Sequence, residues 1–586
     1  MKVKRFIACG LGVILTTGMC GTLSGCLKKG AEGVDKNKTQ IYVGVYQGGF
    51  GTDYFEGLAS RFMQAHPDYD AKYQIFPMYD KENDPVIAST IENGTGNQLY
   101  LWSTNNYIST IYKDKLEDLS DILTYKVDGE NGGTIGDKLY NKAMYQQTYS
   151  KFGQGMYALP FAETILGLTY DHQVFLENEF YEFATANADG AALAAQGIQY
   201  TVSGNKLVFS SATDEVNYKV GDYILTAGQD GKYGTYDDGQ PTTVAGFEAM
   251  LAKITGASMK AFISAGSLTV TDYTRSVLAS LVAQYAGQKA FEAYYTLDSK
   301  GESVALQDGQ SAVITKENGY LVDSMQAIAD AYTFYNKYFD PKDESSAYLS
   351  HSAVTDTNTN NLNAQSMFLL GYRQSAKNPQ SAFLVEGNWW EYEARGVFND
   401  FNKMGEEERG YGKREYRYLL FPDLEGQKLD KAAFGSYTSG VFIVPKDENK
   451  DRLKVTKEFV AFMLSDESLR YFTSTTGSPM PYDYEMTAKD FEAMTPFAKN
   501  VYALYHDTKN VYIPNTSILR LSNPIRFAGG MGVDNAFSTA DGSTPLLLVK
   551  TKTLSEILVG LKAQTTKHQD AWSGYLAEIE RQGFTN

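Results

Sequence analysis

The chain has 586 residues and a formal net charge of −17 at neutral pH, so it is too long for one ordinary core and too acidic to attract a phosphate backbone. Its composition, with 43% hydrophobic and 21% charged residues, is that of a globular protein rather than a fibrous or disordered one. These values indicate at least two lobes and argue against nucleic acid as a partner.

Residues 1–25 have the features of a signal peptide for export. Lys2, Lys4 and Arg5 precede an apolar run of 14 residues, from Phe6 to Met19. This run is too short for a transmembrane helix but typical of a secretory signal. Its removal takes away three positive charges and no negative ones, so the exported chain carries about −20.

Cys26 follows Ser24 and Gly25, and this arrangement resembles the lipobox of bacterial lipoproteins, in which the cysteine is lipidated and becomes the first residue. The alternative is an ordinary cleavage site beside a free cysteine. The two other cysteines belong to the signal, so Cys26 has no partner for an internal disulfide. Lipid on Cys26 would supply the acyl chains that stable anchoring requires, and residues 27–39 would form a flexible tether.

Strand and helix patterns alternate over the next part of the chain. Three apolar segments are interpreted as strands, namely 40–46, 72–76 and 98–102. This alternation predicts an α/β lobe with a largely parallel sheet, in which ligands lie beyond the carboxyl ends of the strands. Tyr46 and Gln47 fall at one such end, and Trp102 and Asn105 at another. The glycines after the first strand match no phosphate-binding pattern and are interpreted as turn residues.

Glu163 lies between two apolar segments, 156–160 and 165–170, that are both interpreted as buried strands. The first would end at Pro160, because proline cannot donate to a strand ladder. A carboxylate on so short a connection can face a ligand where the chain passes between lobes. The alternative is a solvated turn residue.

Residues 176–243 interrupt the alternation and are interpreted as an insertion in the second lobe, with a hairpin at 200–210. Asp230, Asp237 and Asp238 lie in its glycine-rich turns. These carboxylates could hold calcium, a cation that takes oxygen ligands, but their spacing is not that of an EF-hand loop. A plain acidic turn is the favoured alternative.

Paired tryptophans follow the strand predicted at 381–385. Trp389 and Trp390 come directly after Asn388, in the position of a ligand-facing strand end. A sugar ring has an apolar face and a rim of hydroxyls, so flat aromatic rings and short polar side chains suit its recognition. The alternative is that both indoles pack in the core.

Several of these segments resemble, in order and spacing, the extracellular solute-binding proteins of ABC importers, specifically the carbohydrate-binding group that includes maltose-binding protein. The matching segments are 41–51, 100–105, 159–170, 387–389, 435–445 and 455–479. The chain departs from this family in its length, in the insertion 176–243, and at Asn105, where the family often has an acid.

The resemblance implies a periplasmic-binding-protein-like α/β fold of type II, with two α/β lobes joined by a hinge. The expected parts are the signal 1–25, the lipidated tether 26–39, lobe 1 from 40–158 plus 433–478, and lobe 2 from 159–432 plus 479–586. The residues expected to contact the ligand are Tyr46, Gln47, Trp102, Asn105, Glu163, Asn388, Trp389, Trp390 and Tyr437.

By the same resemblance the chain is a binding protein and not an enzyme. It would capture a carbohydrate, an oligosaccharide, between its lobes and deliver it to the permease subunits of an ABC transporter. It would act as a monomer, anchored by lipid to the outer face of the cell membrane, with no cofactor apart from the calcium considered above.

Two other functions remain open from the residues alone. An exported glycoside-processing enzyme would need a second carboxylate to act with Glu163, and no residue is singled out for that role. Zinc-protease and serine-hydrolase motifs are absent from the sequence. A binding protein for a non-sugar solute, such as a peptide, polyamine or metal, would keep the same fold.

Overall fold

The computed structural model describes residues 33–80, 87–102, 110–111, 113–126, 133–210, 218–265, 273–340, 348–350, 359–373, 379–532, 536–539 and 541–584. Cys26 and Asn105, two residues with predicted roles, lie outside these ranges. Among the residues that the structure describes, no helix is both long and apolar enough to cross a membrane.

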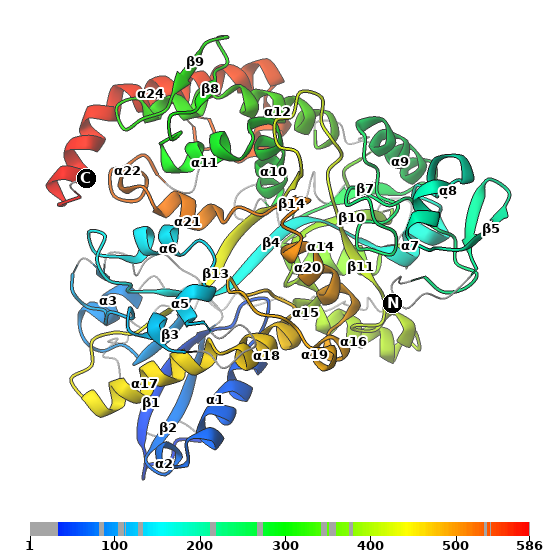
Figure 1. The fold of residues 1–586 in the computed structure, drawn as a ribbon. Helices are drawn as coiled ribbons and strands as arrows, with labels where there is room; N and C mark the ends of the chain where they lie inside the picture. Colours follow the sequence, from blue (N-terminus) through cyan, green and yellow to red (C-terminus); the bar gives the residue numbers. More distant parts are fainter. Residues whose placement is uncertain are drawn as a thin grey trace, which may run out of the picture.

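A mixed sheet of eight strands runs through the whole molecule, in the order β2-β1-β3-β13-β4-β10-β7, with β11 beside β4 (Figure 1). Its strands are β1 (Thr39–Tyr46), β2 (Tyr73–Asp80), β3 (Leu99–Trp102), β4 (Leu159–Asp171), β7 (Lys260–Ile263), β10 (Ser381–Gly387), β11 (Tyr416–Leu419) and β13 (Gly435–Ile443). β1 is parallel to β2 and β3, whereas β4 and β13 are antiparallel to each other and to their neighbours. Parallel pairing is therefore confined to β1, β2 and β3 at one end of the sheet and to β7 and β10 at the other.

The two long strands β4 and β13 join two lobes. They cross the centre of Figure 1, with β1 to β3 on one side and β7, β10 and β11 on the other. Lobe 1 is the side that contains β1 to β3, and lobe 2 is the side that contains β7, β10 and β11. Because β4 and β13 pair with each other along most of their length, they form the hinge through which the lobes are connected.

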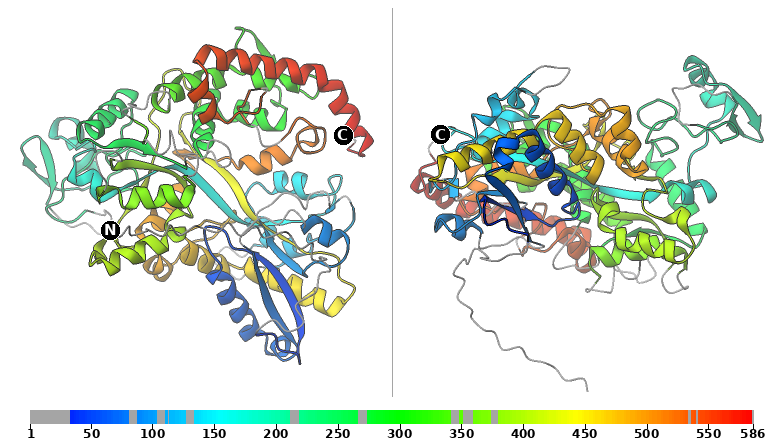
Figure 2. Two further views of the ribbon diagram at one scale, coloured as in Figure 1. Left: turned by 180° about the vertical axis from the view of Figure 1, so that it is seen from behind. Right: turned by 90° about the horizontal axis from the view of Figure 1, so that it is seen from below.

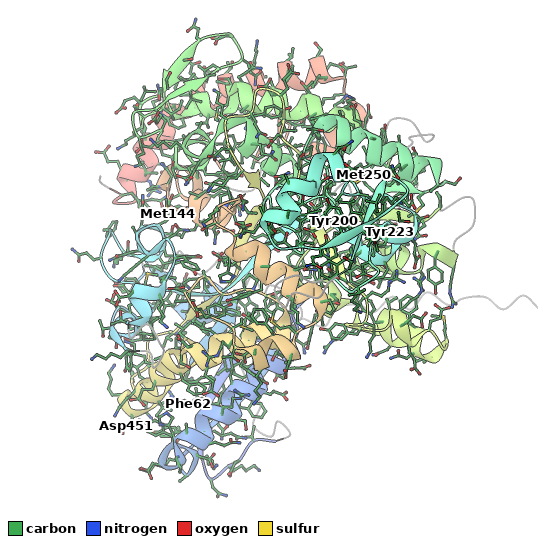
Figure 3. The ribbon with its side chains drawn as sticks, turned by 45° about the vertical axis from the view of Figure 1, so that its right-hand side comes forward. Phe62, Met144, Tyr200, Tyr223, Met250 and Asp451 are labelled. Atoms are coloured by element: carbon green, nitrogen blue, oxygen red, sulfur yellow. The ribbon has the colours of Figure 1, made fainter. Side chains whose placement is uncertain are left out.

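Lobe 1 covers its part of the sheet with short helices and one long pair. Its helices are α1 (Asp53–Ala65), α2 (Pro67–Asp70), α3 (Ile87–Glu92), η1 (Ile122–Thr124), α5 (Ile135–Lys138), α6 (Lys142–Tyr149), α17 (Lys450–Met463), α18 (Asp466–Thr476) and α19 (Ala488–Ala493). Helix α1 forms where Phe55, Leu58 and Phe62 recur at helical spacing, and all three are buried. Phe62 packs on Phe459 of α17 with ring centroids 5.1 Å apart, and Figure 3 labels Phe62 on α1 and Asp451 near the start of α17.

Lobe 2 is larger and mostly helical outside the sheet. Its further elements are α7 (His172–Glu177), α8 (Ala186–Ala195), β5 (Tyr200–Ser203), β6 (Lys206–Phe209), α9 (Val244–Gly256), α10 (Thr274–Ala286), α11 (Gln288–Thr296), β8 (Ser303–Ala305), β9 (Ser311–Val313), η2 (Gly319–Ser324), α12 (Gln326–Tyr338), α14 (Asn361–Leu369), η3 (Gly371–Arg373), α15 (Trp390–Glu393), α16 (Arg395–Lys403), η4 (Glu407–Arg409), β12 (Ala432–Ala433), α20 (Pro496–His506), β14 (Val511–Tyr512), α21 (Thr516–Leu521), α22 (Pro524–Phe527), α23 (Pro545–Thr551) and α24 (Leu554–Arg581). The tyrosines of α12 are buried in the main core of lobe 2.

The insertion 176–243 protrudes from the edge of lobe 2 (Figure 2). Its predicted hairpin is confirmed: β5 and β6 pair in antiparallel register, and Gly204 takes a left-handed conformation in the turn between them, with φ of 63°. The insertion has a small core of its own, formed by Ala184, Leu193, Ile198, Leu207, Phe209, Ile224 and Tyr233.

Lobe 1 extends past residue 478, where the family resemblance placed its end. Met480, Tyr482 and Met494 belong to the same buried cluster as Ile41 and Val43 of β1. The chain therefore returns to lobe 2 only with α20.

Candidate functional site

Tyr46 and Trp102 meet at one end of the lobe 1 sheet. They lie one residue beyond the paired residues Val45 and Leu101, on neighbouring parallel strands. Their ring centroids are 5.9 Å apart. Tyr46 is half-buried and Trp102 is 2% exposed, so the indole is the inner ring of the pair and the tyrosine the outer one. The Nε1–H group of Trp102 has no acceptor among the described residues. Gln47, the next residue after Tyr46, is also half-buried.

Trp389 belongs to lobe 2 but packs in the buried core of lobe 1. It precedes α15, and its indole lies against Tyr273 and Tyr437, with centroid distances of 5.8 and 6.1 Å. A Cβ atom at Gly49, in the turn after β1, would lie 2.1 Å from Cδ1 of this indole, and one at Gly387 would lie 2.0 Å from its Cζ3. Both positions therefore require glycine, and the ring lies between a glycine from each lobe.

Together, Tyr46, Trp102, Tyr273, Trp389 and Tyr437 form what we call the aromatic cluster. Its members come from β1 and β3 of lobe 1, from the residue before α10, from the residue before α15, and from the hinge strand β13. Burial raises the pKa of both Tyr273 and Tyr437, and the charge of Glu386 adds to this effect.

Two buried carboxylates flank the aromatic cluster. Gln365 donates through Nε2 to Glu393 at 2.6 Å and to Glu386 at 3.3 Å. Burial raises the pKa of Glu386 well above its usual range, and the charge of Glu393 adds to this effect. Burial also raises the pKa of Glu393, against hydrogen bonds from Gln365, Asn361 and Trp389. The two buried carboxyl groups are therefore linked through Gln365, with Glu393 beside Trp389.

A polar contact joins the lobes beside the aromatic cluster. The carboxylate of Asp53, at the start of α1, accepts hydrogen bonds from the Tyr392 hydroxyl at 2.7 Å and from Arg395 at 3.1 Å. The Arg395 guanidinium lies 3.5 Å from the centroid of the Tyr392 ring. The hydrogen bond from Tyr392 is the largest influence on Asp53 and lowers its pKa. This contact links the two lobes, and it weakens as Asp53 is protonated in acid.

Glu163 lies within one continuous strand, β4, and not on a connection between two strands as predicted. Its carboxylate is 5% exposed and accepts hydrogen bonds from Tyr145 at 2.7 Å, from Asn515 at 2.8 Å and from Tyr505. These donors come from three helical segments that meet at the hinge. Glu163 therefore organises the hinge, and its hydrogen-bonding capacity is used within the protein.

Trp390 packs within lobe 2, whereas Asn388 links lobe 2 to the hinge strand β4 and to lobe 1. Asn388 accepts a hydrogen bond from the backbone N–H of Ile165 at 2.9 Å and donates to Ser478 at 3.1 Å. Trp390 is fully buried, with its ring against those of Phe368, Phe398, Tyr416 and Phe497. The expectation that both tryptophans face a ligand is thus corrected for Trp390, because successive side chains at a helix start point in different directions.

Glu391, next to Trp390, is 3% exposed and accepts a hydrogen bond from Thr495 at 2.6 Å. Burial raises its pKa to about 8. The folded chain therefore holds this proton more tightly than the unfolded chain does, and the stability gained below pH 4.5 is lost as pH rises through about 8. Glu391→Gln should remove this loss and raise the free energy of unfolding at pH 7.5 by on the order of 2 kcal/mol.

Urea denaturation at pH 5 and pH 7.5 measures this effect on Glu391. The gain of the variant over the wild type should be larger at pH 7.5. An equal difference at both pH values would mean that the carboxyl group keeps its ordinary pKa.

The acidic turn of the insertion satisfies its carboxylates internally. Asp237 accepts hydrogen bonds from the backbone of Gln229 at 2.7 Å and of Asp230 at 3.0 Å. Asp238 accepts from the backbone of Gly234 at 2.7 Å and from the Tyr218 hydroxyl. Burial raises the pKa of Asp237 to about 7 and that of Asp238 to about 6. No group of three potential metal ligands is found among the described residues.

This geometry fits the plain acidic turn better than the calcium site. We expect the melting temperature to be the same with a chelator and with added calcium, because backbone donors already occupy the carboxylate oxygens. Thermal melting monitored by circular dichroism tests this expectation. A lower melting temperature in chelator that calcium restores would favour calcium at Asp230, Asp237 and Asp238.

Sequence reasoning missed three members of this site. Tyr273 lies just before α10 and belongs to no recognisable sequence motif. Only the packing of the folded chain places it in the aromatic cluster. Glu386 and Glu393 had a signal in the sequence, since they flank the tryptophan pair at a spacing of seven. These two glutamates could have been predicted as the hydrogen-bonding groups that accompany the aromatic rings at a ligand site.

The fold is shared with bacterial binding proteins of known structure. The apo-form of RafE from Streptococcus pneumoniae has a TM-score of 0.51 at 12% identity, over 92% of this chain and 99% of that chain. A chitin oligosaccharide binding protein has 0.50 at 14% identity, over 92% and 100%. A probable secreted solute-binding lipoprotein from Streptomyces coelicolor has 0.51 at 10% identity, over 90% and 99%. No protein-family model and no curated protein sequence matches the chain.

Proposed function

We propose that this chain, which has the type II periplasmic-binding-protein fold, is the substrate-binding subunit of an ABC importer and captures a carbohydrate between its lobes. The aromatic cluster carries this proposal, because it combines the Tyr46–Trp102 pair of lobe 1 with Trp389, which packs on Tyr273 of lobe 2 and on Tyr437 of the hinge. A saccharide offers an apolar face to such rings and hydroxyls to the acids and amides beside them.

The polar groups of the site suit a ligand rich in hydroxyls. The buried indole N–H of Trp102, which lacks an acceptor among the described residues, can donate to a hydroxyl oxygen. The carboxylate of Glu393, close to Trp389, can accept from a hydroxyl. An uncharged sugar satisfies both kinds of group without placing a further charge in a buried site.

Closure of the lobes follows from the same contacts. A ligand that touches Tyr46 of lobe 1 and Trp389 of lobe 2 gains affinity only when the lobes are together, so it shifts the equilibrium toward the closed state. The contact of Asp53 with Tyr392 and Arg395 supports that state. As an exposed ion pair, Asp53 and Arg395 add little by themselves.

The location and partners are inferred from the N-terminal sequence and from the fold. Cys26 would carry the lipid that anchors the chain to the outer face of the membrane, and the residues directly after it would allow the lobes to reach the permease. The tether expected at 27–39 ends earlier than predicted, because the backbone N–H of Asp35 donates to Gln74 and Thr39 begins β1. The proposed role ends with delivery of an intact sugar to that permease, as a monomer and without catalysis.

The hinge geometry disfavours the enzyme alternative. Glycoside cleavage needs two carboxylates placed on either side of the bond. Glu163 is surrounded by donors, and its hydrogen-bond partners are tyrosines and an asparagine. A charged solute such as a polyamine would need exposed acids, whereas the described site is dominated by aromatic rings.

A panel of neutral oligosaccharides tests the proposal. The mature chain without Cys26 is titrated with each sugar while intrinsic tryptophan fluorescence is recorded, and the mixture is then analysed for cleavage products. We expect a saturable change with at least one sugar and no turnover. Cleavage of any sugar, or saturation only by peptides, polyamines or metal ions, would contradict the proposal.

A further inference from the structure

One side of the segment from Trp389 to Arg395 is turned toward lobe 1. The segment consists of α15 and the start of α16, and Trp390 anchors it in a buried cluster of lobe 2. Trp389, Tyr392 and Arg395 recur at every third position, so they share one side of this helical segment. All three contact lobe 1, and Figure 1 shows α15 and α16 beside α18 of that lobe.

The turn after β1 supplies the complementary surface in lobe 1. A Cβ atom at Gly49 would have atoms of Trp389 as its three nearest neighbours, the closest at 2.1 Å. A Cβ atom at Gly51 would lie 2.4 Å from Cε1 of Tyr392, and the φ of Gly51, 65°, also favours glycine. Side chains of lobe 2 therefore lie directly on the backbone of this turn, in the space that each glycine leaves.

Asp53 continues the same pattern two residues after Gly51. Its carboxylate accepts hydrogen bonds from Tyr392 at 2.7 Å and from Arg395 at 3.1 Å. Tyr392 is only 6% exposed, whereas the ion pair of Arg395 with Asp53 is largely exposed and adds little. We call the six residues of this contact the interlobe latch: Gly49, Gly51, Asp53, Trp389, Tyr392 and Arg395.

We propose that the interlobe latch holds the two lobes closed before any ligand binds. Its contacts join groups of the chain itself, so it needs no ligand to form. Trp389 is 7% exposed in the latch. Separation of the lobes would expose apolar surface of this indole and break the hydrogen bond from Tyr392 to a charged acceptor. Both effects favour the closed state.

A latch that forms without ligand makes opening the step that admits a sugar. Because Trp389 is enclosed in the closed state, a ligand reaches it only in molecules whose latch is open, and the apparent affinity falls with the fraction of such molecules. This consequence rests on the function proposed above. The closed resting state does not, because it is a property of the chain without sugar.

The distance between the lobes in the absence of sugar tests the proposal directly. The three cysteines of the chain are at positions 9, 20 and 26, so the mature chain without Cys26 takes spin labels only at introduced cysteines. Ala65→Cys on α1 and Asn399→Cys on α16 are at exposed positions outside the latch. Double electron–electron resonance measures the distance between the two labels. We expect one short distance for the intact latch.

Two substitutions weaken the latch in different ways. Tyr392→Phe removes the hydrogen bond to Asp53 and keeps the ring, so the ratio of open to closed molecules should rise by about tenfold. Gly49→Ala places a methyl group against Trp389 of the other lobe, so we expect mainly the longer distance. Circular dichroism shows whether each variant is folded, and Tyr392→Phe is the milder change of the two.

Each variant has a matched control. Tyr79→Phe also removes a hydrogen bond from a tyrosine to a carboxylate, but Tyr79 donates to Glu56 within lobe 1. Gly396→Ala also adds a methyl group, but a Cβ atom at Gly396 would meet nothing within 4 Å. Both controls should keep the short distance of the intact latch.

Either of two results would overturn the proposal. One is a mainly long distance in the sugar-free chain with the intact latch. The other is a short distance that persists in both Tyr392→Phe and Gly49→Ala. Failure of every sugar to bind would count against the function proposed for the lobes, whereas the distances measured without sugar would still decide whether the latch holds them closed.

Discussion

Trp389→Ala is expected to weaken saccharide binding by about a hundredfold or more, because truncating a buried aromatic anchor costs about 2–4 kcal/mol of binding free energy. The indole contacts Tyr273 and Tyr437 and is covered by the turn at Gly49. Its removal leaves the ligand without the ring that both lobes share. Isothermal titration calorimetry with the tightest sugar of the panel measures the loss.

Trp390→Phe is the matched control for Trp389→Ala. Its ring lies among phenylalanines and a tyrosine of lobe 2, so the variant should bind the sugar as the wild type does. Unchanged affinity in Trp389→Ala would remove the indole from the site. A loss in Trp390→Phe equal to that in Trp389→Ala would show that the measurement reports damage to lobe 2.

Glu163→Ala is expected to lower the free energy of unfolding by about 3–5 kcal/mol, because it leaves buried donors of Tyr145, Asn515 and Tyr505 without their acceptor. The position of this carboxylate in the sequence predicts contact with the ligand. The structure instead places it in the hinge, so its loss should act first on stability. Urea denaturation without sugar gives the value.

Glu163→Gln is the conservative comparison. The amide keeps one acceptor oxygen but cannot accept from all three donors, so we expect an intermediate loss of about 1.5–3 kcal/mol. A wild-type denaturation midpoint in Glu163→Ala, together with a large fall in sugar affinity, would contradict the hinge role and restore the role in ligand contact.

The lobe 1 part of the site could be predicted because it depends on local order along the chain. Parallel neighbouring strands end at the same edge of a sheet, so the residues at the ends of β1 and β3 had to lie together. Tyr46 and Trp102 do so. The α/β character and the two-lobed arrangement followed from the alternation of strands and helices and from the family resemblance.

The hinge could not be predicted from apolar runs alone. Pro160 suggested that a strand ends there, yet it is the second residue of β4. It pairs with Val441 at a point where the register of β13 shifts, and a missing N–H is tolerated beside such an irregularity. The strand continues, and Glu163 is carried into the interior, where long-range donors meet it.

The two tryptophans show a second limit of sequence reasoning. Adjacent residues at the start of a helix point to different sides, and composition does not say which side faces the other lobe. Trp389 joins the core of lobe 1 and Trp390 that of lobe 2. Which indole faces lobe 1 depends on Gly49 and Gly387, which leave space for the Trp389 ring. This space exists only in the folded protein.

The most direct measurement is a crystal structure of the mature chain with the sugar that binds most tightly in the panel. We predict a sugar ring within about 4 Å of both Tyr46 and Trp389, enclosed by lobe 1 and lobe 2 together. A sugar bound to one lobe only, with the rings of Tyr46 and Trp389 still packed as they are without ligand, would contradict capture between the lobes.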